Sequence, residues 1–156
     1  MLRIEQVDVG PRRVEARVRV VDPRFLRTTS VPGLAQAADS LLPGLKRHTC
    51  ENDDGRSFLR ELADTETPHL LEHVAAELMA LSGSPRSLKA STSWDFAADG
   101  QGVFRVSLEY DDDLVAVGAL KEAQPVVEWL LSSVDSGAVL SPDIDAAVAR
   151  LRAARG

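Results

Sequence analysis

Three stretches of the chain alternate apolar and polar residues, a pattern typical of strands with one buried face. They cover residues 13–20, 89–96 and 103–110. Residues 1–9 mix apolar and charged positions and can form a further strand. Gly10-Pro11 and Asp99-Gly100 stand between neighbouring stretches, so the sequence predicts two hairpins.

Other stretches repeat apolar residues at helical spacing, over residues 34–42, 57–62, 68–81, 118–133 and 141–154. Pro125 falls inside the fourth and is expected to kink or restart that helix. In the last, Ser141 is the expected cap and Pro142 the first helical residue. This order of elements predicts an α+β fold, with an antiparallel sheet of about four strands and helices packed on one face. We expect a single domain spanning residues 1–156.

The helix expected over residues 68–81 has two unlike sides. One side is apolar, as on an ordinary core helix. The other carries His69, Glu72, His73 and Glu77. Because His69 and His73 are four residues apart, their imidazoles lie one above the other and can bind one metal ion. The order H-x-x-E-H is the inverse of the helix motif of zinc proteases.

This arrangement suggests zinc chemistry, because neutral imidazoles bind zinc and a zinc-bound water loses its proton near neutral pH. Glu72 is then the candidate general base. Catalytic zinc usually has three protein ligands, and Glu77 is expected to be the third because it lies four residues beyond His73. His48 and Cys50 are reserve ligands, which a loop can fold over the helix. The competing interpretation is a solvated helix face that carries two histidines by chance.

Composition narrows the class of protein. With 44% hydrophobic and 27% charged residues, the 156-residue chain has the balance of a soluble globular domain. Its net charge of −6 disfavours a nucleic-acid partner and suits a basic one. A single cysteine excludes an internal disulfide. No apolar run is long enough to span a bilayer and the N-terminus lacks a signal-peptide core, so we expect a cytoplasmic protein without a membrane partner.

Short landmarks follow one another in a recognisable order over roughly residues 30–152. They are Pro32-Gly33-Leu34, Leu42-Pro43-Gly44-Leu45 with His48 and Cys50, Phe58 to Leu62, His69 to Ala75 with Glu77-Leu78, Leu108 to Asp111, and Asp143 to Arg152. Together they resemble the N-terminal domain of cyanophycin synthetase, an enzyme that builds a poly-aspartate polymer with arginine side branches. Such synthetases continue into an ATP-grasp ligase domain and a Mur-ligase-like domain, so we expect a stand-alone homologue of the first domain.

The resemblance implies that the domain holds the polymer and, in some members, cuts it at a metallopeptidase-like site to supply primers. The helix is also inverzincin-like, since mitochondrial processing peptidases and S-ribosylhomocysteinases carry the same H-x-x-E-H order. We therefore expect a zinc-dependent, metallopeptidase-like hydrolase of a peptide-like polymer, such as an aspartate/arginine polymer. Glu72 would be its catalytic residue, with His69, His73 and Glu77 as metal ligands.

Two alternatives remain open. The first is a non-catalytic module that binds an arginine-rich polymer or peptide through Glu72, Glu77, Glu109 and the run 111–113, or that docks on a ligase partner. Three segments that depart from the family pattern favour it, namely residues 53–56, 66–68 and 87–90. The second is a structural or regulatory protein whose histidines bind nothing.

Overall fold

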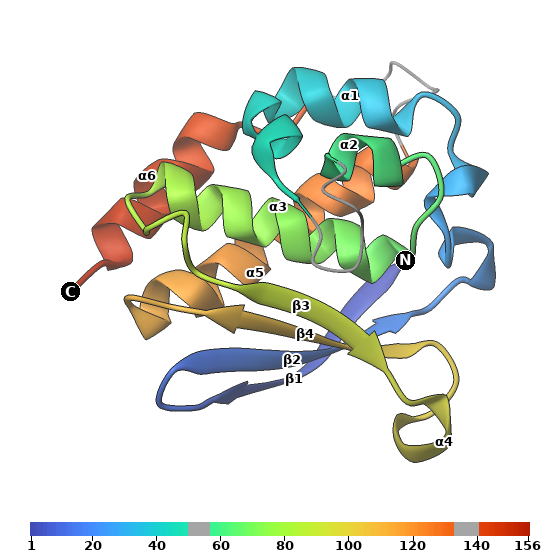
Figure 1. Cartoon of the computed structure of the whole chain (residues 1–156), viewed down its shortest axis with the longest axis horizontal. Coiled ribbons are helices and arrows are strands. Elements are labelled where there is room, and N and C mark those ends of the chain that lie inside the picture. The colour runs from blue at the N-terminus through green and yellow to red at the C-terminus, as the bar shows by residue number, and fades with distance from the viewer. Residues whose placement is uncertain (50–56, 133–140) are drawn as a thin grey trace.

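The four strands form one antiparallel sheet in the computed structural model, which describes residues 1–49, 57–132 and 141–156 (Figure 1). The strands are β1 (Leu2–Val9), β2 (Arg13–Val20), β3 (Ala90–Trp94) and β4 (Val103–Glu109). Their order in the sheet is β1-β2-β4-β3, so β1 and β3 are the edge strands. The sheet and the helices on one side of it confirm the predicted α+β fold.

The alternating pattern of β2 and β4 explains why helices cover only one face of the sheet. Val14, Ala16 and Val18 of β2 are fully buried on that face. Ala16 pairs with Val106 and Val18 with Phe104, and both partners are buried as well. Successive side chains of a strand point to opposite faces, so one apolar row supplies the sheet's half of the core.

The described part of the chain forms helices of 4 to 20 residues. The helices are α1 (Leu34–Leu41), α2 (Phe58–Glu61), α3 (Thr67–Leu81), α4 (Phe96–Asp99), α5 (Asp113–Ser132) and α6 (Ile144–Ala154). Three 3₁₀ turns accompany them, η1 (Pro23–Phe25), η2 (Thr28–Ser30) and η3 (Pro43–Arg47). The α3 helix packs on α5, β3 and β4, and α5 packs on β1 and β2. In Figure 1, α1 and α2 lie beyond α3, on its side away from the sheet.

Two helix starts differ from the expected ones because an aspartate caps each helix. The α5 helix begins at Asp113, well before residue 118, because Asp112 Oδ1 accepts hydrogen bonds from the N–H groups of Leu114 (3.0 Å) and Val115 (3.3 Å). The α6 helix is capped by Asp143, which accepts from the N–H of Ala146 at 3.0 Å, and the expectation of a cap at Ser141 was wrong.

Two further elements differ from the sequence pattern. The α5 helix continues through Pro125 without a restart. Pro125 is exposed, so the carbonyl that it leaves without a helical partner lies on the side of the helix nearest water. The strand expected over 89–96 ends at Trp94, and Asp95 instead caps the single helical turn α4 through the N–H of Ala98 at 3.1 Å.

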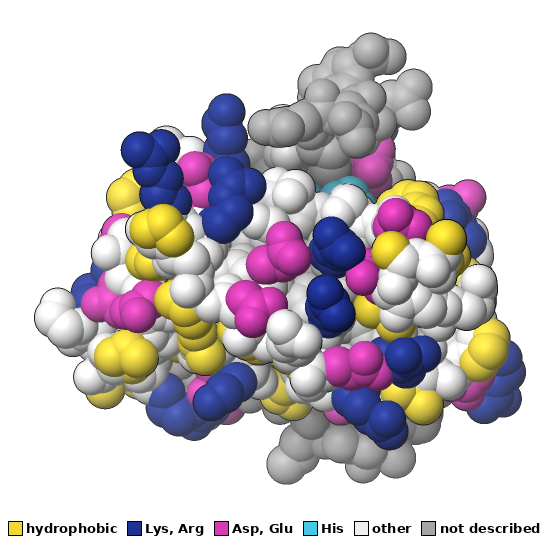
Figure 2. Space-filling model, turned by 90° about the horizontal axis from the view of Figure 1, so that it is seen from below, with side chains coloured by type: hydrophobic (Ala, Val, Ile, Leu, Met, Phe, Trp, Pro, Cys, Tyr) yellow, Lys and Arg dark blue, Asp and Glu magenta, His cyan; other side chains and the backbone are white. Residues whose placement is uncertain are grey.

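The outer face of the sheet is charged but not dominated by one sign. Seen from below, basic and acidic side chains are interleaved across it (Figure 2). Arg105 binds Asp99 through two hydrogen bonds of 2.7 and 2.8 Å, and Arg19 pairs with Glu5. In the part of the chain that the structure describes, no helix is long and apolar enough to cross a membrane.

Replacement by valine should change the free energy of unfolding in opposite directions at two buried threonines near the start of α3. Thr67 is fully buried and its hydroxyl has no hydrogen-bond partner, whereas the Thr28 hydroxyl accepts from the Thr65 N–H at 3.0 Å. Thr67→Val should raise the free energy of unfolding by about 1 kcal/mol, because it removes an unsatisfied buried group. Thr28→Val should lower it by about 1–3 kcal/mol. Urea unfolding of both variants measures this, and equal signs would contradict it.

Candidate metal centre

The polar side of α3 is buried rather than solvated. Glu72, His73 and Glu77 are 3%, 7% and 1% exposed. The segments that pack around this side include η3 and the edge strand β3. Buried polar and charged groups are costly unless they are hydrogen-bonded or paired. The chemistry of the site therefore depends on which hydrogen-bonding and charged groups these neighbouring segments bring to it.

Three of the predicted site residues form a group that can hold a metal ion: His69, Glu72 and His73. The Nε2 atoms of His69 and His73 lie 3.1 Å apart. Glu72 Oε2 lies 3.0 Å from His73 Nε2 and 3.5 Å from His69 Nε2. Two ligands bound to one tetrahedral zinc at its usual bond lengths are about 3.3 Å apart. The donor atoms and their spacing thus fit a single cation.

His48 and Glu77 also belong to the cluster, but they meet His73 at its other ring nitrogen. His48 Nδ1 lies 2.8 Å from His73 Nδ1, and His48 Nε2 lies 2.9 Å from Glu77 Oε1. Arg86 donates to both Glu77 oxygens, at 2.7 and 3.2 Å. The ligand role expected for Glu77 and the reserve role of His48 stay predictions, and Cys50 lies outside the described residues.

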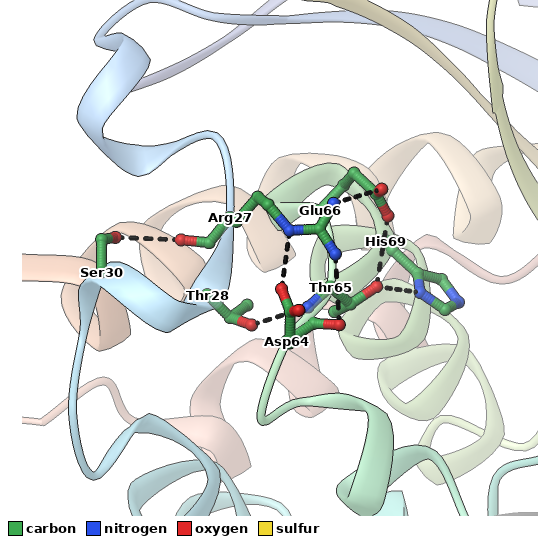
Figure 3. Close-up of polar contacts among 7 residues, drawn as sticks. All are labelled: Arg27, Thr28, Ser30, Asp64, Thr65, Glu66 and His69. Carbon is green, nitrogen blue, oxygen red and sulfur yellow. Dashed lines mark hydrogen bonds and ion pairs between the residues drawn. The ribbon is translucent and has the colours of Figure 1, made fainter.

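A second set of contacts surrounds His69 (Figure 3). The Thr65 hydroxyl lies 2.9 Å from His69 Nδ1 and donates to Glu66 Oε2 at 3.3 Å. Glu66 is in turn bound by Arg27 at 2.8 Å. Arg27 also binds Asp64 at 2.6 Å, which fixes the segment that leads into α3.

Phe58, at the start of α2, forms an apolar wall against both imidazoles. Its ring stacks on His73 at 3.7 Å and meets His69 edge-on at 5.1 Å. The Phe58 N–H donates to the carbonyl of His48 at 2.8 Å, so this contact joins two of the rings that neighbour His73. An apolar wall limits water access and lowers the local dielectric around a metal site.

The electrostatics of the cluster keep His73 neutral and Glu77 ionised. Burial, and to a smaller extent the neighbouring His69 and His48, which would repel a further positive charge, together lower the pKa of His73 to about 2. Burial alone would raise the pKa of Glu77, but hydrogen bonds from His48 and Arg86 outweigh it and lower that pKa to about 2. A neutral imidazole is the form that binds a metal ion.

The group lies in a cleft of about 540 Å³ between α3 and the edge strand β3. His69, Glu72 and His73 line one wall, and the consecutive residues Lys89–Thr92 line the other. Side chains of consecutive strand residues point to opposite faces, so a run of neighbours can line a cleft only along the strand's open edge. The cleft therefore presents backbone as well as side chains beside the metal group.

Sequence reasoning missed Phe58, Thr65 and Arg86 as parts of this site. Each comes from a segment outside the α3 helix, and the spacing of residues within one helix says nothing about its neighbours. Phe58 did stand among the family landmarks, which was the one available signal. The contacts that these residues make appear only in the folded chain.

Residues 17–132, more than half of the chain, match the family described as the cyanophycin synthase-like N-terminal domain. The chain belongs to this family. It is also 28% identical over 102 residues to the cyanophycin synthetase of Geminocystis herdmanii (strain PCC 6308). That match covers 62% of this chain and 11% of the synthetase, so this cyanophycin synthase-like domain corresponds to a small part of its relative. The family expected from the landmarks is thereby confirmed.

The metal-free domain is expected to lose stability as the pH falls below 6.5. The pKa of His73 is lowered from 6.5 to about 2 in the folded chain, so between these values the unfolded chain binds a proton that the folded chain does not. The free energy of unfolding should fall by up to about 1.4 kcal/mol per pH unit in this range. Urea unfolding in the presence of a chelator measures it.

The variant His73→Gln is the control for this prediction, because it should flatten the slope between pH 6.5 and pH 4.5. Glu77 does not contribute there, since its pKa is lowered from 4.5 and its stabilisation is lost only below that value. Equal slopes in the wild type and the variant would contradict the assignment.

Proposed function

We propose that the protein is a zinc-dependent, metallopeptidase-like hydrolase that cleaves peptide-like bonds in an aspartate/arginine polymer. The observation that carries this proposal is the group of His69, Glu72 and His73 in one cleft, with their donor atoms 3.0–3.5 Å apart. Two neutral imidazoles beside a carboxylate are the donor set that catalytic zinc uses.

The residues would divide the work as follows. His69 and His73 hold the ion through Nε2. When bound, zinc supplies a water of lowered pKa and polarises the scissile carbonyl. Glu72 Oε2, beside both Nε2 atoms, takes the proton of the attacking water and passes it to the leaving nitrogen. Phe58 keeps bulk water from one side of the imidazoles.

Two carboxylates compete for the third ligand position. Glu77, the ligand expected from the sequence, already accepts hydrogen bonds from His48 and Arg86. Glu72 Oε2 lies 3.0 Å from His73 Nε2 and 3.5 Å from His69 Nε2. Substituting each carboxylate distinguishes their roles. Loss of a ligand removes the metal, whereas loss of the general base removes only the cleavage activity.

The cleft supports a peptide-like substrate. Within the described residues, β3 pairs only with β4, so its other edge can add an extended chain through backbone hydrogen bonds. Glu61 and Glu109 line the same cleft and suit arginine side branches, whereas Glu66 lines it but is already bound by Arg27. Arg47 and Lys89 line it too and suit free carboxylates. Both signs of charge match a polymer that carries both.

Metal analysis of protein purified without a histidine tag tests the proposal. We expect near-stoichiometric zinc that is lost in the double variant His69→Ala, His73→Ala. Glu72→Gln should keep zinc and lower cleavage of an aspartate/arginine polymer by at least about 10²-fold, as expected for a missing general base. New amino termini are the readout.

Glu15→Gln is the control, since Glu15 lies on β2, outside both the cleft lining and the metal group. It should leave zinc content and turnover of saturating polymer near those of the wild type. Loss of zinc in Glu72→Gln would reassign Glu72 as a ligand, and metal-free wild-type protein would reject the hydrolase.

A second candidate is a non-catalytic module that binds the same polymer, and the glutamates of the cleft favour it. The acidic run 111–113 contributes less than expected, because Asp111 binds Ser84 and Arg155 while Asp112 caps α5. For a module, the double variant His69→Ala, His73→Ala should bind the polymer as tightly as the wild type. Calorimetric titration measures this, and binding should weaken with added salt. In the docking form of this alternative, the module binds a ligase partner that acts on the same polymer.

A further inference from the structure

We propose that Trp94 is a specificity-determining residue of the cleft, whose exposed ring stacks on the guanidinium of an arginine side branch. The proposal rests on the substrate class proposed above. It adds a residue that selects this substrate, separate from the residues that would hold a metal ion.

Trp94 differs from the other exposed apolar residues in where it lies. It is the last residue of β3 and is 50% exposed. The other large hydrophobic residues that are exposed in the described part of the chain are Val9, Val21 and Leu114, and none of them lines the cleft, whereas Trp94 does. Single exposed apolar side chains are ordinary on a protein surface. An exposed indole inside a cleft instead offers a ligand a large, flat contact face.

Packing against two phenylalanines holds the indole in place. Trp94 pairs with Phe104 of β4, so the two side chains lie on the same, helix-covered face of the sheet. The ring centroid of Trp94 is 5.4 Å from that of the buried Phe104 and 6.4 Å from that of Phe96. The indole is thus fixed by packing although it is half-exposed. A ligand that stacks on it therefore loses little affinity to the ordering of a mobile side chain.

The direction of β3 places Trp94 at the end of the cleft where His69 lies. Helix α3 and strand β3 both line the cleft and run in opposite directions (Figure 1). The strand advances about 17 Å from Lys89 to Trp94, and the helix covers about 17 Å between Ala80 and His69. The end of β3 therefore lies beside the start of α3. A side branch held on Trp94 would belong to a substrate residue close to the metal group.

The other groups at this end of the cleft suit a cation. Glu61 and Glu66 line the cleft and stand just before or at the start of α3. Among the described residues, the one cation that lies over an aromatic ring is Arg24, at 5.8 Å from the centroid of Phe25. The ring of Trp94 is therefore not covered by an arginine or lysine of the described chain, and it can accept one from a substrate.

A guanidinium is the cation that fits this ring best. It is planar, always charged and more weakly hydrated than an ammonium group, so it stacks on aromatic rings. Tryptophan gives the strongest cation–π contact of the aromatic side chains. Citrulline has nearly the same planar shape as arginine but no charge. Exchange of arginine for citrulline in the side branches therefore removes the cation and keeps the shape.

Binding of a short synthetic aspartate/arginine polymer to the metal-free protein tests the proposal, with a chelator present so that no cleavage occurs. The chain has two tryptophans, so Trp129→Phe leaves Trp94 as the single fluorophore. We expect saturation with the arginine polymer to change the emission of Trp94. The citrulline polymer should bind more weakly and change the emission less. Emission that responds to protein concentration alone would assign the ring to a contact between copies and overturn the proposal.

Calorimetric titration of variants measures the selectivity. The ratio of arginine-polymer to citrulline-polymer affinity should fall about 2–30-fold in Trp94→Leu, the range expected for one cation–π contact. Trp94→Phe keeps an aromatic ring and should retain part of the preference. Leu114→Ala is the control, because it removes an exposed apolar side chain outside the cleft and should leave the ratio unchanged. An unchanged ratio in Trp94→Leu would overturn the proposal.

The zinc-loaded protein separates this proposal from that of the hydrolase. If the polymer is cleaved, Trp94→Leu should raise KM for the arginine polymer and leave kcat near the wild-type value, since the stacked branch is bound alike before and during the reaction. Cleavage with the same preference for arginine in Trp94→Leu would overturn the role of Trp94 and leave the hydrolase standing. Selective binding that depends on Trp94, without cleavage, would support the role of Trp94 and reject the hydrolase.

Discussion

The polar side of one helix is buried, and much of the structure around the site follows from this constraint. Glu72, His73 and Glu77 on α3 are almost inaccessible to water. A buried polar group left without a partner costs about 1–3 kcal/mol, and more when it is charged. Neighbouring segments meet this demand with polar groups of their own, His48 after η3 and Arg86 before β3. The site is therefore a product of packing as much as of sequence spacing.

Helix geometry brings the residues of the metal group close together, and tertiary contacts orient them. The spacing of four residues along α3 brings the two Nε2 atoms to 3.1 Å, and any regular helix would bring the two rings close. Their orientation comes from Thr65, His48 and Phe58, which lie outside this helix. A metal site needs both, because its histidine rings must be held with the ligating nitrogen facing the ion.

The family context and the site geometry bear on different questions. The match over residues 17–132 shows which family the chain belongs to, and the relative's name connects that family with a synthetase. The cleft beside β3 offers an open strand edge and charges of both signs, which are suited to a peptide-like chain with charged branches. Function must be argued from the site rather than from the fold, and here the donor atoms of His69, Glu72 and His73 provide that argument.

Periodicity and spacing are local properties, so the sequence alone determined the strands, most helices and the common face of His69 and His73. The helix starts were only partly predicted, since Asp143 caps α6 in place of the expected Ser141 and Asp112 caps α5 before its expected start. Only the tertiary structure decided that the polar side of α3 is buried, that His48 meets His73, and that Glu77 accepts from His48 and Arg86. Such contacts join segments far apart in the chain, and they depend on how the core brings those segments together.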